Sequence, residues 1–111
     1  MKGNHIGELE ELVLLVVGLL YEGAYGVSVL KEIKAQTGRE VNISAIHSTM
    51  NRLEEKGLLS SKMGGSSSTR GGRRKRLYFL TSSGRLTLDQ VRSVREKLYS
   101  QLPGTSFQFS H

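Results

Sequence analysis

The sequence predicts a mainly α-helical fold with one small β-hairpin, and three observations support this fold class. Apolar residues recur at steps of three and four in four separate stretches, as they do along one face of a helix. Two short runs suited to strands flank a tract rich in Gly and Ser, as in a hairpin with a long loop. The 111 residues correspond to the length of one domain with its own hydrophobic core.

The first helix is expected from Ile6 to about Tyr21. Its second half is apolar on every side, so this helix should be covered on more than one face. The pattern does not decide between two ways of burying this helix: contact with a partner chain, or packing as an ordinary central core helix within its own domain. The apolar side chains at helical spacing are Ile6, Leu9, Leu12, Val13, Val16, Val17 and Leu20.

A second helix is expected after a turn at residues 22–26, and Gly38 is suited to a left-handed cap at its end. The apolar residues along this helix are Val27, Leu30 and Ile33. Residues 40–43 (EVNI) alternate between polar and apolar side chains. This alternation predicts a short strand.

The third helix has the clearest limits in the sequence. Ser44 is a suitable N-cap. Gly57 is a suitable left-handed C-cap, after which Leu58 can fold back on Leu53 in a Schellman motif. Its buried face is expected to hold Ile46, Met50 and Leu53.

The hairpin follows directly, with strands expected at residues 58–63 and 74–81. The connection at 64–72 is rich in Gly and Ser and is long for a hairpin, which predicts a projecting, flexible loop.

A last helix is expected from a cap at Thr81 to a stop at Pro103, and residues 103–111 are expected to form a disordered tail. One side of this helix carries the apolar stripe Leu88, Val91, Val94, Leu98 and Leu102.

The charge of the chain is segregated along the sequence. The net charge is +6, but residues 1–60 carry −2 and residues 61–111 carry +8. Such segregation is typical of a protein that is steered to an anionic surface. Five cations lie at the end of the Gly/Ser tract without an acid between them: Arg70, Arg73, Arg74, Lys75 and Arg76.

Several function classes are disfavoured by the same composition. The chain has no Cys, and its three His are scattered, so no metal and no cofactor are expected. No set of nucleophile, base and orienting group is visible, so an enzyme is not expected. The longest apolar run, residues 12–21, is about half the length that spans a bilayer, and acidic residues precede it where a signal peptide would be basic. These features predict a soluble, cytoplasmic protein without a membrane partner.

The order of the elements is typical of a winged helix-turn-helix, in which the third helix enters the major groove of DNA and the hairpin contacts the backbone or the minor groove. On this fold, side chains that project away from the buried face of the third helix are expected to contact DNA: Ser44, His47, Ser48, Asn51 and Arg52. The five cations at 70–76 are expected to contact phosphate from the wing, because the planar fork of Arg suits phosphate oxygens.

Three segments resemble the PadR-like family of winged-helix transcriptional regulators. They are LVLLVVGLLYEGAYGVSVLKEI, ISAIHSTMNRLEEKGLL and RKRLYFLTSSGR, and the resemblance spans roughly Leu9–Leu88. The length is similar to that of the short subfamily with a single C-terminal helix. The resemblance implies a homodimer that represses transcription. It also implies that an effector, if one binds, is an apolar or aromatic small molecule near the dimer seam; the sequence does not identify the residues that would bind it.

These inferences combine into one expected organisation. Residues 1–81 form the winged helix-turn-helix DNA-binding domain, and residues 82–102 form a dimerisation helix packed on it. The protein is expected to bind an inverted repeat in double-stranded DNA as a homodimer. The alternative is a winged-helix module for protein–protein assembly without specific DNA binding. RNA or anionic lipid fits less well, because an aromatic stacking platform and a basic amphipathic face are both missing. The expected dimer contacts are Leu12, Val16, Leu88, Val91, Val94, Leu98 and Leu102.

Overall fold

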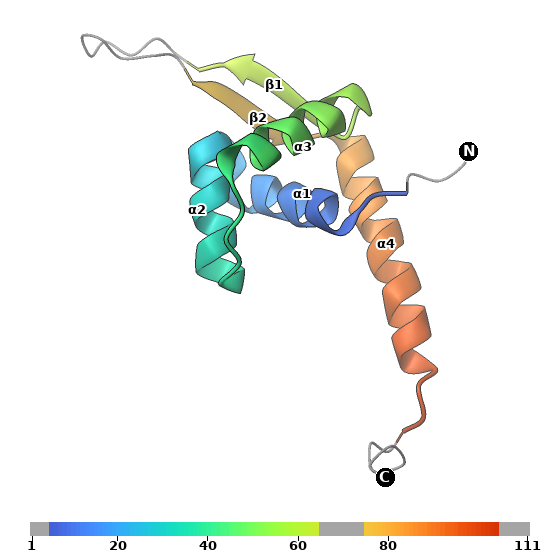
Figure 1. The fold of residues 1–111 in the computed structure, drawn as a ribbon. Helices are drawn as coiled ribbons and strands as arrows, with labels where there is room; N and C mark the ends of the chain where they lie inside the picture. Colours follow the sequence, from blue (N-terminus) through green and yellow to red (C-terminus); the bar gives the residue numbers. More distant parts are fainter. Residues whose placement is uncertain (1–4, 65–74, 105–111) are drawn as a thin grey trace, which may run out of the picture.

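The computed structural model describes residues 5–64 and 75–104, which form four α-helices, one 3-10 turn and a two-stranded antiparallel hairpin (Figure 1). In chain order the elements are α1 (Glu8–Leu20), η1 (Tyr21–Gly23), α2 (Gly26–Thr37), α3 (Ile43–Glu55), β1 (Leu59–Met63), β2 (Arg76–Leu80) and α4 (Ser82–Ser100).

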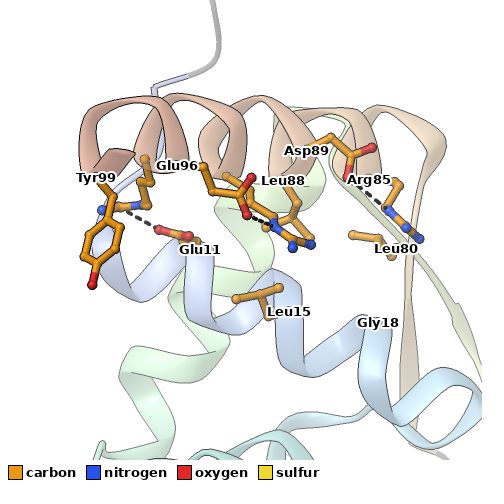
Figure 2. A pocket seen from close by; sticks show the side chains of 11 residues that line it. Glu11, Leu15, Gly18, Leu80, Arg85, Leu88, Asp89, Glu96 and Tyr99 are labelled. Atoms are coloured by element: carbon orange, nitrogen blue, oxygen red, sulfur yellow. Dashed lines mark hydrogen bonds and ion pairs between the residues drawn. The ribbon is translucent and has the colours of Figure 1, made fainter. Parts of the chain in front are cut away.

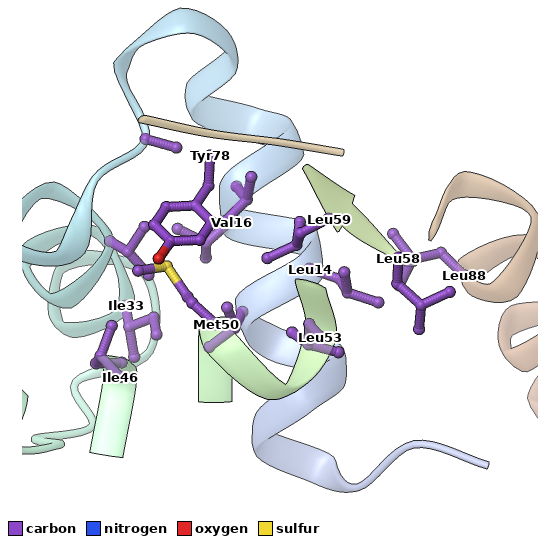
Figure 3. Close-up of a cluster of buried hydrophobic side chains, with 14 residues drawn as sticks. Leu14, Val16, Ile33, Ile46, Met50, Leu53, Leu58, Leu59, Tyr78 and Leu88 are labelled. Atoms are coloured by element: carbon purple, nitrogen blue, oxygen red, sulfur yellow. The ribbon is translucent and has the colours of Figure 1, made fainter. Parts of the chain in front are cut away.

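The helix α1 is the centre of the domain and contacts α2, α3, β2 and α4. It begins at Glu8, where the backbone N–H of Gly7 donates to Glu10 Oε1 at 2.8 Å. The three glutamates of its first turn suit the positive end of the helix dipole. Its buried apolar residues, Val13, Leu14, Val16 and Val17, lie along one side of the helix, whereas Leu15 and Leu19 are exposed, so the single chain does not cover α1 all round. Figure 3 shows Leu14 and Val16 within a core to which α2, α3, α4 and both strands also contribute.

The chain between α2 and α3 differs from the expectation in two ways. The strand predicted at residues 40–43 is wrong, because the described sheet consists of β1 and β2 and α3 already begins at Ile43. The N-cap of α3 is Asn42 and not Ser44: Asn42 Oδ1 accepts the backbone N–H of Ala45 at 2.8 Å. The cap of α2 is as predicted, with Gly38 left-handed at φ 74°.

The end of α3 is the predicted Schellman motif. Gly57 has φ 80°, and its N–H donates to the carbonyl oxygen of Glu54 at 2.9 Å. The N–H of Leu58 donates to the carbonyl oxygen of Leu53, also at 2.9 Å. Leu53 and Leu58 are both buried, so the motif turns the chain into β1 while it closes one edge of the core.

The hairpin pairs β1 with β2 from Leu59 opposite Leu80 to Met63 opposite Arg76. Tyr78 is buried and Leu80 packs against the core, so the face of β2 that carries these two residues lies on the domain. The opposite face, with Leu77 and Phe79, is half-buried.

The helix α4 begins at the predicted cap, where Thr81 Oγ1 accepts the backbone N–H of Gly84 at 2.9 Å. Its first turns pack on the domain through Gly84, Thr87 and Leu88. Every residue from Arg92 to Gly104 is exposed, and Figure 1 shows this part of α4 extending away from the other helices.

Within the described ranges 5–64 and 75–104, no single helix is long and apolar enough to cross a membrane. Segments 8–23 and 26–37 reach the necessary length and apolar composition only when they are taken together, and they are bent by 120° relative to each other.

Candidate nucleic-acid interface

One face of α3 is exposed and carries hydrogen-bonding side chains. The buried residues of the helix are Ile46, Thr49, Met50 and Leu53. Because successive residues advance by about 100°, the opposite face projects into solvent. A shallow depression on this face is lined by Ile43, Ser44, His47, Ser48, Asn51, Arg52 and Glu55. All five residues predicted to contact DNA from this helix are therefore exposed and lie together.

His47 lies against the first turn of α2. A Cβ atom added to Gly26 would lie 2.5 Å from His47 Cε1, which is closer than a real contact allows. The imidazole therefore lies directly over Gly26, and a side chain at that position would displace it.

Asn51 is linked to the hairpin by a buried tyrosine. The hydroxyl of Tyr78 on β2 donates to Asn51 Oδ1 at 3.3 Å. Burial raises the pKa of Tyr78, and the charge of Glu54 adds to this effect, so the hydroxyl keeps its proton and remains a donor. The amide group of Asn51 consequently has a partner that favours one orientation.

Arg52 on α3 and Lys56, the C-cap residue that follows α3, both contact the carboxylate of Glu10 on α1. Arg52 Nε lies 3.1 Å from Glu10 Oε2, and Lys56 Nζ lies 3.0 Å from the same oxygen. Burial alone would raise the pKa of Glu10, but hydrogen bonds from Gly7, Lys56 and Arg52 outweigh it, so its pKa is lowered below the ordinary value. Sequence reasoning missed Glu10, because nothing near it in the chain indicates a partner on α3.

The described part of the wing base places cations beside α2 and β1. Lys75 Nζ lies 4.2 Å from the centroid of the Tyr25 ring, a distance at which a cation is attracted to the ring face. Arg76 donates from Nη1 to Ser61 Oγ at 2.9 Å. The other predicted wing cations, Arg70, Arg73 and Arg74, lie outside the described residues.

A second surface lies between α1 and α4 and is hollowed into a groove of about 650 Å³ (Figure 2). Three ion pairs border it: Arg95 with Glu11 at 3.0 Å, Arg92 with Glu96 at 2.8 Å, and Arg85 with Asp89 at 3.3 Å. The apolar part of its lining includes Leu15, Leu80 and Leu88.

The exposure of the predicted dimer residues divides them into two groups. Val16 and Leu88 are only 3% and 8% exposed within the single chain, so their assignment to the dimer interface is corrected: they are core residues. Leu12 and Val91 are half-buried, and Val94, Leu98 and Leu102 are exposed. Leu15 and Leu19 on α1, which the sequence analysis did not single out, are 49% and 58% exposed. The only signal for them in the sequence was that this helix is apolar on every side.

Comparisons with known proteins find one family and several solved structures that are similar to this chain. The model of the transcriptional regulator PadR-like family matches residues 13–90. A PadR family regulator from Eggerthella lenta is 30% identical with a TM-score of 0.65, and the match covers 84% of this chain and 80% of that one. A PadR-like transcription factor from Bacteroides fragilis is 23% identical with a TM-score of 0.70, and the match covers 85% of each chain.

PadR from Bacillus subtilis, in a structure with its operator DNA, has a TM-score of 0.61 at 22% identity; the match covers 75% of this chain and 45% of that one. No curated protein matches the chain.

Proposed function

The chain belongs to the PadR-like family of transcriptional regulators, and on that premise we propose that it binds a specific site in double-stranded DNA and represses transcription. The observation that carries this proposal is the exposed face of α3, where hydrogen-bonding side chains lie together beside the cationic base of the hairpin. The Bacillus subtilis relative, whose structure is a complex with operator DNA, supports DNA binding by a chain of this fold.

In this proposal α3 enters the major groove with its N-terminal half foremost. Ser48 and Asn51 carry groups that bond base edges, and Arg52 can bond guanine or phosphate. Ser44 and His47 line the same depression and complete the contact surface. Glu54 and Glu55 near the end of the helix would repel phosphate, so that end of the helix lies further from the duplex.

The wing supplies affinity that depends little on sequence. Lys75 and Arg76 at its base are exposed, and the sequence places three more arginines within the preceding six residues. Each cation that neutralises a phosphate releases counterions from the DNA and makes binding more sensitive to salt.

A homodimer is part of the proposal, built from α1 and the exposed half of α4. A single chain leaves large apolar side chains uncovered on these two helices, and contact with a second copy would bury them. They are Leu15, Leu19, Val94, Leu98, Tyr99 and Leu102. Residues 1–81 then act as the DNA-binding domain and residues 82–102 as the dimerisation helix. A two-fold dimer requires an inverted repeat with half-sites about one helical turn apart.

An effector, if the protein has one, is proposed to be an apolar or aromatic small molecule in the groove between α1 and α4. The groove is large enough for such a molecule and combines apolar walls with paired charges at its rim.

Selection of bound duplexes from a random pool, followed by a footprint on the enriched sequence, tests the proposed function. Enrichment of one inverted repeat is the expected result. Weak binding without any enrichment would contradict the proposal and favour a module for protein–protein assembly.

A further inference from the structure

Glu10 connects the central helix of the domain to the helix proposed to read DNA. Its side chain is 10% exposed, and it belongs to α1, yet two of its three partners are cations on α3 and at the C-cap of α3. We infer that Glu10 is a specificity-determining positioning residue, which, through Arg52 and Lys56, sets how strongly the protein prefers its own site over random duplex. This inference rests on the proposed function.

One edge of the Arg52 guanidinium is bonded within the protein, and the rest of the side chain is exposed to solvent. Its Nε donates to Glu10 at 3.1 Å, and its Nη2 lies 3.5 Å from Thr49 Oγ1 on the preceding turn. The side chain is nevertheless 51% exposed and borders the same depression as Ser48 and Asn51. The guanidinium is planar, so anchoring one edge fixes the direction of the remaining donors. A donor held in one direction distinguishes a matching base edge from a mismatched one better than a mobile cation does.

Lys56 is held by the same carboxylate in a different way. Its Nζ lies 3.0 and 3.2 Å from the two oxygens of Glu10, and its side chain is 35% exposed. An ammonium group on a flexible stem binds any phosphate within reach and carries no sequence information. Glu10 therefore restrains a cation that would otherwise favour random and specific DNA alike.

Two consequences of losing this carboxylate act in the same direction. Lys56 follows Glu54 and Glu55 at the end of α3 that lies further from the duplex, but its flexible four-carbon stem lets the freed ammonium group extend toward flanking phosphate. Together with the lost negative charge, this strengthens binding to any duplex. The freed Arg52 explores more orientations and discriminates less between bases. The ratio of specific to random affinity should fall because random binding becomes tighter and because Arg52 favours the specific site less. Damage to the fold alone would weaken binding to both duplexes.

The replacement Glu10→Gln tests the inference with little disturbance. Glutamine has nearly the same volume and can still accept the N–H of Gly7 at the start of α1. Glu8→Gln is the matched control: it removes the same charge from the same helix, but its carboxylate is 81% exposed and pairs with Arg39 at 3.2 Å. Dissociation constants are measured for the selected site and for random duplex over a series of salt concentrations.

The expected result for Glu10→Gln is tighter binding to random duplex, with a salt slope steeper by about 0.9 for each phosphate newly contacted. The specific-to-random ratio is expected to fall about fivefold, the lower end of what one well-oriented bidentate contact contributes. Glu8→Gln should leave the ratio unchanged. Adding Lys56→Gln to Glu10→Gln should return the salt slope on random duplex to the wild-type value, because the released cation is then absent.

Equal ratios in wild type and Glu10→Gln, or weaker binding to both duplexes, would overturn the inference. If the wild-type protein itself shows no preferred site, the proposed function is contradicted, and not only the role given to Glu10. Glu10→Asp provides a second test if Glu10→Gln does not fold: it keeps the charge but is one methylene shorter and cannot reach both cations. It is expected to lower the ratio as well, and an unchanged ratio in a folded Glu10→Asp protein would contradict the role given to Glu10.

Discussion

The hydroxyl of Thr81 donates to the carbonyl oxygen of Gly57 at 2.8 Å, and this bond joins the start of α4 to the end of α3. The backbone N–H of Thr81 donates to the next carbonyl oxygen, that of Leu58, at 3.2 Å. Gly84 lies against the same carbonyl, since a Cβ atom added there would be 2.2 Å from it. The helix proposed for dimerisation is thus anchored directly to the helix proposed for DNA reading, so the dimer axis and the spacing of the two α3 helices depend on this junction.

Replacement of Thr81 by Val tests the strength of the junction. The hydroxyl both donates to Gly57 and accepts from the N–H of Gly84, and valine has the same shape without either bond. Loss of the cap and of the bond to Gly57 is expected to lower the free energy of unfolding by about 1–2 kcal/mol, measured by urea denaturation. Ser82→Ala, at the exposed next position, is the control and should change stability by less than about 0.5 kcal/mol. Equal effects of the two replacements would contradict the role given to Thr81.

The dimer proposal predicts that charge on the exposed stripe of α4 separates the subunits. Val94 and Leu98 are 57% and 61% exposed, so Val94→Glu combined with Leu98→Glu should leave the single chain folded while placing two carboxylates in the interface. Sedimentation velocity should show monomers. Ser93→Glu adds a charge about 100° around the same helix from Val94 and about 140° from Leu98, and should leave the dimer intact. A double variant that sediments like wild type would rule out this surface as the interface.

The wing prediction concerns the salt dependence of binding. Arg73→Ala with Arg74→Ala should reduce the slope of log affinity against log salt by up to about 3.6 in a dimer, because each phosphate contact contributes about 0.9. Specific and random duplex should weaken by similar factors. Lys34→Ala with Lys97→Ala removes the same charge from the last turns of α2 and α4 and serves as the control. A loss confined to A·T-rich flanks would instead indicate an arginine in the minor groove.

The lowered pKa of Glu10 predicts a defined pH dependence of stability. A carboxyl group of this kind stabilises the fold fully above its pKa in the unfolded chain, about 4.3, and loses that contribution as pH falls through the lower folded-state pKa. Wild type should therefore be more stable than Glu10→Gln near neutral pH, and the difference should shrink as the solution is acidified below about pH 4.3. Urea denaturation of both proteins across this range measures it. Glu8→Gln removes an exposed ion pair that contributes little at any pH. A difference that is constant with pH would show that the charge of Glu10 does not stabilise the fold.

Local features of the fold could be predicted because their causes lie within one turn of chain. The Schellman motif depends on Gly57 and on bonds from two adjacent residues, and the cap of α4 depends on Thr81 and Gly84. The exposed face of α3 follows from helical geometry once Ile46 is buried. The strand expected at residues 40–43 failed because alternation over four residues indicates a strand only where a neighbouring strand is available to pair with it.

The sequence by itself determined the order of the elements apart from the strand expected at residues 40–43, the C-terminal end of α3, the start of α4, and which residues α3 exposes, because each depends on the chain within a few residues. Only the tertiary structure decided which side of α1 is covered, so that Val16 lies in the core while Leu15 is exposed. It also decided that Glu10 meets Arg52, 42 residues away, and Lys56, 46 residues away. The physical reason is that an ion pair between distant residues requires two packed helices to present both partners at one place, and this depends on how the whole core packs.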